Sequence, residues 1–128
     1  MMKRLLLMLV VAAFACAGAM AQAVIKFDKT NHNFGTFKES QKLHYEFVFT
    51  NTGDKPLVIQ QAYSSCGCTV PSFPKDPIAP GAKGKLAVVY NGKGKFPGHM
   101  KKSITVRTNA ANSMVRVYIE GNMVADDE

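Results

Sequence analysis

The stretch Leu43-His44-Tyr45-Glu46-Phe47-Val48-Phe49-Thr50 places a large apolar side chain at every second position. Side chains two residues apart on a β-strand project from the same face. Leu43, Tyr45, Phe47 and Phe49 would therefore point one way, and the polar residues among them the other. Alternation with one wet face is typical of a strand in an antiparallel sheet. This segment predicts a strand with one face in a hydrophobic core.

Six other segments show strand patterns: Val24–Phe27, the region near Phe34–Phe37, Leu57–Tyr63, Leu86–Tyr90, Ser103–Thr108 and Val115–Glu120. Turn-forming residues separate them, and nothing after residue 21 shows a sustained period of 3.6. About seven short strands in roughly 100 residues predict an all-β fold, an immunoglobulin-like antiparallel β-sandwich. Prolines at every third position from Pro71 to Pro80 predict a stiff connector that crosses from one sheet to the other.

The first 21 residues have the features of an export signal. Lys3 and Arg4 precede an apolar run, and Ala19-Met20-Ala21 provides the small residues at which signal peptidase cleaves. We therefore expect an exported protein, periplasmic or at the cell surface, with a signal peptide at 1–21. A β-sandwich domain at 22–125 and an acidic tail at 126–128 would follow.

Two alternatives stay open for the N-terminus. An uncleaved anchor is one, although the run is short beside the about 20 residues that a membrane span needs. Lipidation at Cys16 is the other, because this cysteine follows a small residue near the end of the apolar segment. The large aliphatic residue usual three positions before such a cysteine is missing. We expect no membrane span after processing.

Four motifs occur in a characteristic order after residue 24. They are His32-Asn33-Phe34-Gly35-Thr36, Phe49-Thr50-Asn51-Thr52-Gly53-Asp54-Lys55-Pro56-Leu57, Cys66-Gly67-Cys68-Thr69-Val70-Pro71 and Pro77-Ile78-Ala79-Pro80-Gly81. In this order the chain resembles domain-of-unknown-function family 1573, a bacterial group common in exported proteins of the Bacteroidetes type. The resemblance covers residues 24 to 122 and implies an immunoglobulin-like fold related to the major sperm protein. It implies no activity.

Cys66 and Cys68 are the only cysteines after the expected cleavage site. Residues i and i+2 share one face of a strand, and Gly67 can bend the backbone enough to close a disulfide. Such a bridge would stabilise the folded state little, but it is a candidate redox couple. The reduced pair could instead bind Cu(I). A semi-buried structural pair is the third interpretation. No histidine stands at a spacing that would complete a metal site.

The positive charge is unevenly distributed in this chain, whose formal net charge is +7. Between Pro77 and Ile119 all charged residues are basic: Lys83, Lys85, Lys93, Lys95, Lys101, Lys102, Arg107 and Arg116. The six lysines form a candidate anion-facing patch. Lysines that keep a sheet soluble and guard its edges are the alternative. Export and the lack of interleaved stacking aromatics argue against nucleic acid.

No set of residues suited to acid–base or nucleophilic catalysis is identifiable. We therefore expect a non-enzymatic binding or structural module of the cell envelope that needs no cofactor. Its partner would be an unknown envelope protein or an anionic surface. The alternative is a periplasmic protein that binds copper, or performs thiol redox chemistry, through the Cys-Gly-Cys motif.

Overall fold

A computed structural model of the chain describes residues 21–127. This part contains strands and no helix, and so no helix that is long and apolar enough to cross a bilayer. Cys16, and the expected signal peptide apart from Ala21, lie outside the described residues. The strands are β1 (Ile25–Phe27), β2 (Asn31–Lys38), β3 (Lys42–Asn51), β4 (Ile59–Tyr63), β5 (Thr69–Ser72), β6 (Lys83–Asn91), β7 (Gly98–Thr108) and β8 (Met114–Val124).

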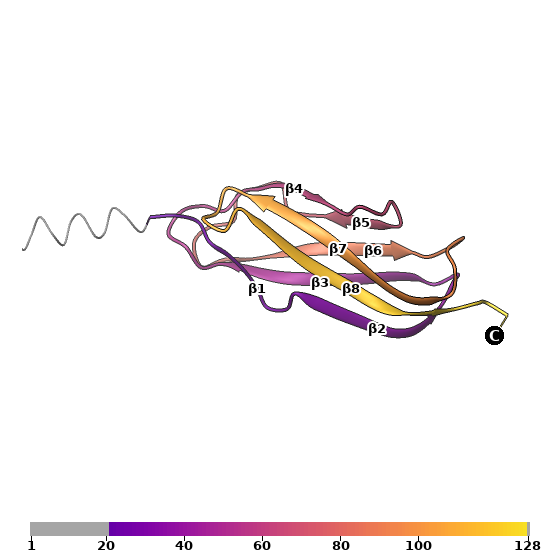
Figure 1. The fold of residues 1–128 in the computed structure, drawn as a ribbon. Helices are drawn as coiled ribbons and strands as arrows, with labels where there is room; N and C mark the ends of the chain where they lie inside the picture. Colours follow the sequence, from indigo (N-terminus) through magenta and orange to yellow (C-terminus); the bar gives the residue numbers. More distant parts are fainter. Residues whose placement is uncertain (1–20, 128) are drawn as a thin grey trace, which may run out of the picture.

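Two four-stranded sheets form the sandwich in Figure 1. The first, sheet A, has the strand order β1-β3-β6-β5, and the second, sheet B, has the order β2-β8-β7-β4. The predicted all-β, immunoglobulin-like sandwich is confirmed.

The expectation of purely antiparallel pairing is wrong for one pair of strands. β2 runs parallel to β8, with Asn31 opposite Tyr118 and Lys38 opposite Val124. Only residues 28–30 separate β1 from β2, so the chain passes to the other sheet without turning back. Alternation reports which face of a strand is buried, but it does not report the direction of the neighbouring strand.

The core lies between the inner faces of the two sheets. Eight apolar side chains of β3, β6, β7 and β8 are at most 1% exposed: Phe47, Phe49, Leu86, Val88, Ile104, Val106, Val117 and Ile119. These residues occupy the alternate positions that the sequence pattern assigned to the inside. Burying large apolar side chains stabilises the fold by about 1.5–3 kcal/mol each, so these strands supply most of the driving force.

β5 is the strand that the sequence pattern did not reveal, because Pro71 lies within it and it directly follows the cysteine motif. Proline is tolerated on an edge strand, and β5 is an edge of sheet A. The predicted proline-rich crossing is wrong. The chain crosses from sheet B to sheet A in residues 64–68, and the segment containing Pro74, Pro77 and Pro80 joins β5 to β6 within sheet A.

Each of the four edge strands has a feature that hinders pairing with another chain. β1 has three residues, and β5 contains Pro71. The pairing of β2 shifts register between Asn33 and Thr36, around Gly35 with its φ of 72°, and that of β4 shifts between Ile59 and Gln61. The edges are therefore poor surfaces for adding a strand, and the loops are the better candidates for contact with other molecules.

Candidate functional site

The cysteine motif forms a closed loop between β4 and β5. Cys66 and Cys68 are joined by a disulfide, and their Cα atoms lie 5.2 Å apart. Gly67 lies at the exposed tip, and a Cβ added there would meet nothing within 4 Å. The bridge forms with Gly67 outside the positive-φ region, so the glycine is not required by the backbone conformation.

The two sulfur atoms of this disulfide have different surroundings. Cys66 is half-buried, whereas Cys68 is 9% exposed and belongs to the core. The Cys68 backbone N–H donates a hydrogen bond to Cys66 Sγ at 3.2 Å, and Cys68 Sγ lies 3.6 Å from Thr69 Oγ1. The Asn91 N–H donates to the Cys68 carbonyl at 2.8 Å, which fastens the loop to the end of β6.

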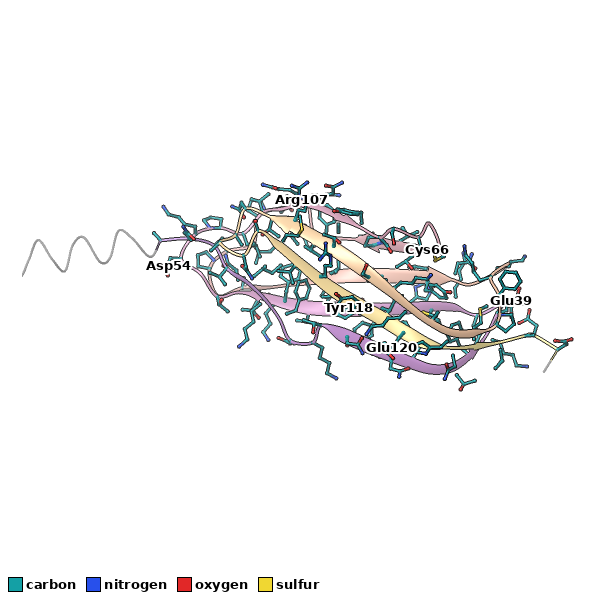
Figure 2. The ribbon with its side chains drawn as sticks, in the orientation of Figure 1. Glu39, Asp54, Cys66, Arg107, Tyr118 and Glu120 are labelled. Atoms are coloured by element: carbon teal, nitrogen blue, oxygen red, sulfur yellow. A yellow bond between two sulfur atoms is a disulfide. The ribbon has the colours of Figure 1, made fainter. Side chains whose placement is uncertain are left out.

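Three loops and the C-terminal segment meet at this end of the sandwich. We call the loops 39–41, 64–68 and 92–97 the distal end; Figure 2 shows Cys66 and Glu39 toward it and Asp54 at the opposite end. The Gly94 N–H donates to Glu39 Oε1 at 3.2 Å, which joins the first loop to the third. The Ser40 N–H donates to Asp126 Oδ1 at 2.9 Å and so lowers the pKa of this carboxyl group. Hydrogen bonds thus connect the 39–41 loop to the 92–97 loop and to the C-terminal segment, and the 64–68 loop is bonded to Asn91 at the end of β6.

Phe96 is the most exposed large apolar side chain among the described residues, at 97%. It belongs to the β6–β7 loop, which the Gly94 contact with Glu39 and a bond from the Lys95 N–H to the Gly92 carbonyl hold in place. Phe96 was not among the candidate residues predicted from the sequence. Its position as an aromatic residue in a glycine-rich turn could have indicated exposure. A phenylalanine held in water is a candidate contact residue.

The opposite end is built around Asn51, which is 0% exposed. Its Oδ1 accepts hydrogen bonds from the Val24 and Gly53 N–H groups, at 3.3 and 3.0 Å. Its Nδ2 donates to the carbonyls of Lys55 and Ile78, at 2.7 and 3.0 Å. All four hydrogen-bonding positions of the amide are used, so Asn51 fixes three backbone segments, at residues 24, 53–55 and 78. The sequence pattern placed it only in a turn.

Two further asparagine side chains take the place of peptide groups at this end. Asn109 accepts from the Val58 N–H at 2.7 Å and donates to the Pro56 carbonyl at 3.1 Å. Asn112 Oδ1 accepts from the Ile25 N–H at 3.2 Å, and Asn112 Nδ2 donates to the Ile25 carbonyl at 2.8 Å. Nearby, an open hollow of about 720 Å³ is lined by residues 21–23, 55–56, 58, 77 and 109–111. Lys55 is the single charged side chain among these lining residues.

The histidines lie apart from the cysteines. His32 stacks on Tyr45 with ring centroids 3.7 Å apart, and burial together with nearby Lys29 lowers its pKa. His44 is exposed on β3. His99 lies on β7, with Nδ1 3.3 Å from Asn122 Oδ1. In residues 21–127 no three His, Cys, Asp or Glu side chains gather as a metal site, so Cu(I) would have two thiolates from a reduced pair.

The six lysines of the candidate patch lie on different parts of the sandwich. Lys83 and Lys85 are on β6 of sheet A, and Lys85 Nζ is 3.2 Å from Glu46 Oε2. Lys93 and Lys95 lie in the β6–β7 loop. Lys101 and Lys102 are on β7 of sheet B, where Lys101 Nζ stands 5.2 Å from the centre of the Tyr118 ring. The structure therefore divides the six lysines among sheet A, the β6–β7 loop and sheet B.

The two packed four-stranded sheets define an immunoglobulin-like β-sandwich. The family model described as "Protein of unknown function (DUF1573)" matches residues 25–123, and the chain belongs to this family. The predicted family membership is thereby confirmed. No curated protein matches the chain.

Solved structures with similar folds show low sequence identity. A protein of unknown function from Porphyromonas gingivalis W83 is 14% identical, with a TM-score of 0.69 over 81% of this chain and 48% of that one. The chain thus spans about half the length of that protein. The PapD-like domain 7 of human CEP192 is 10% identical, with a TM-score of 0.61 over 79% of this chain and 85% of that one. The periplasmic chaperone SfaE is 15% identical, with a TM-score of 0.56 over 80% and 58%. At these identities the likeness concerns the fold alone.

Proposed function

We propose that this chain is an exported, non-enzymatic β-sandwich module that binds a partner in the cell envelope through its distal end. The observation that carries the proposal is Phe96, which is 97% exposed on a hydrogen-bonded loop. Placing an aromatic side chain in water costs free energy that contact with a partner recovers. Lys93 and Lys95 precede it in the same loop and favour a partner with negative charge.

The strand edges support loop-mediated binding over strand addition. Pro71 interrupts the β5 edge, and the register shifts interrupt the β2 and β4 edges. The loops of the distal end carry no such obstacle to contact. The module would therefore resemble other sandwiches in which rigid sheets present variable loops.

A photo-crosslinking residue in place of Phe96 tests the proposal in intact cells. We expect a discrete crosslinked product with the Phe96 variant, and none with the same replacement at Met114. Met114 is the matched control because it is also an exposed large apolar residue, at 47%, and it begins β8 at the other end of the hairpin from Gly98. Equal crosslinking at both positions, or none at Phe96, would contradict the proposal. A product of protein mass indicates a protein partner, and a lipid adduct indicates an anionic surface.

Export has its own test in the N-terminus of the protein recovered from the envelope fraction. Cleavage after Ala21 would leave Gln22 first, and mass spectrometry would show the corresponding unmodified chain. A lipid-modified Cys16 would assign the protein to the lipoproteins instead. An intact Met1 in the membrane fraction would indicate an uncleaved anchor.

A further inference from the structure

The Cys66–Cys68 disulfide is placed where it can open without disturbing the sandwich. Both cysteines belong to one loop, and the bond encloses Gly67 alone. A bond across so few residues removes little entropy from the unfolded chain. It also links no two strands, because both cysteines lie in one loop. The buried core holds the two sheets together, and backbone hydrogen bonds hold the strands within each sheet. The bridge is therefore dispensable for the fold.

The two cysteines differ in exposure, and exposure favours access for an attacking thiolate. Exchange requires the thiolate to reach one of the two sulfurs. Cys66 is half-buried between exposed Ser65 and Gly67, whereas Cys68 is 9% exposed and packs in the core. Attack is consequently directed to Cys66 Sγ, and Cys68 Sγ becomes the leaving group.

The hydrogen bonds at the loop suit both sulfurs of the opened pair. The Thr69 hydroxyl, 3.6 Å from Cys68 Sγ, can donate to the thiolate that leaves. The Cys68 backbone N–H, 3.2 Å from Cys66 Sγ, can stabilise negative charge on the second sulfur. A structural crosslink would need neither contact.

We propose that Cys66–Cys68 is a thiol–disulfide exchange site that oxidises a dithiol, of a protein or a small molecule, with Cys66 as the attacked sulfur. A thiolate of the dithiol forms a mixed disulfide with Cys66, and the bonding pair leaves on Cys68, which takes a proton from solvent. The second thiol of the donor then attacks the donor sulfur that is bonded to Cys66, and Cys66 leaves as a thiol. Two electrons and two protons pass to the pair, and the donor leaves as a disulfide.

This role uses the oxidising surroundings that the proposed export provides, but its chemistry is tested on the purified protein. Failure of the exchange is therefore distinguishable from failure of export or of binding at Phe96. The distal position also allows both roles, because residues 64–68 and the Phe96 loop belong to the same end of the sandwich.

Single cysteine variants give the first test. Cys68→Ser leaves the accessible Cys66 thiol, and Cys66→Ser leaves the buried Cys68 thiol as the matched control. With an aromatic disulfide reagent under native conditions, we expect the Cys66 thiol to react about tenfold faster or more. Equal rates or the reverse order would overturn the assignment of Cys66.

The wild-type protein gives a second test that requires no variant. We expect dithiothreitol to reduce the pair in native buffer, with two alkylatable thiols appearing while the circular dichroism spectrum is unchanged. Treatment with glutathione, acid quenching and peptide mapping should place the mixed disulfide on Cys66. A mixed disulfide on Cys68, or reduction only after unfolding, would overturn the proposal.

Discussion

Reducing the Cys66–Cys68 disulfide should cost the fold little stability. The closed loop contains three residues, for which the chain-entropy relation gives about 1.6 kcal/mol at 25 °C, compared with about 4.7 kcal/mol for a 100-residue loop. The bonds from the Asn91 N–H to the Cys68 carbonyl and from the Thr69 N–H to the Cys66 carbonyl remain after reduction. They keep the loop in place, so we expect a loss of about 1.6 kcal/mol or less.

Urea unfolding followed by circular dichroism measures this loss with and without a reductant. A change of about 1.6 kcal/mol corresponds to a shift of the midpoint by roughly 0.5–1.6 M. The double variant Cys66→Ser/Cys68→Ser is the control, and its midpoint should not respond to the reductant. A loss above about 3 kcal/mol on reduction of the wild type would refute the reasoning, because it would show that the bridge supports the sheets.

Five other substitutions test the structural roles assigned above. Gly67→Ala should change the free energy of unfolding by less than about 0.5 kcal/mol. Gly53→Ala should lower it by more than about 2 kcal/mol, because the added Cβ would overlap backbone atoms of residues 22–24. Comparable urea midpoints for the two variants would contradict this pair of predictions. Asn51→Ala should lower the free energy of unfolding by about 3–5 kcal/mol, because it leaves buried backbone groups unpaired. Asn109→Ala should lower it by about 1–2 kcal/mol, because its site is exposed. A smaller loss for Asn51→Ala than for Asn109→Ala in the same assay would contradict the role of the Asn51 hydrogen bonds. The folded-state pKa of His32 lies below its unfolded value of about 6.5, so stability is fully present above that value and is lost as the pH falls through the folded pKa. His32→Gln should therefore weaken the fall in the urea midpoint between pH 7 and pH 5, and an unchanged pH profile would exclude His32 as its source.

Most of the fold could be predicted from alternation. Most inner positions of β3, β6, β7 and β8 are buried as their patterns required, whereas Leu43, Tyr45 and Val115 are partly buried. β5 was missed because proline is read as a strand breaker, although an edge strand tolerates it. The parallel pairing of β2 with β8 depends on contacts between residues far apart in the sequence. No local pattern encodes such a pairing.

The candidate site was only partly visible in the sequence. The spacing of Cys66 and Cys68 allowed a disulfide, which the structure contains. The difference in burial between Cys66 and Cys68 arises from packing against the core. It could not be predicted from the spacing of the two cysteines in the sequence. The lysine cluster in the sequence separates in space, because successive strands carry its members to different sheets. The network of Asn51 depends on carbonyl groups brought from two other segments.

The central claim is that the sandwich stands alone while its distal loops carry the chemistry and the contacts. Backbone amide spectra of the purified chain, recorded by nuclear magnetic resonance in the oxidised and reduced states, test it most directly. We predict changes confined to residues 64–70 and to Asn91, whose N–H contacts the loop. Changes spread through core positions such as Phe47 and Val117, or loss of the dispersed spectrum, would contradict it.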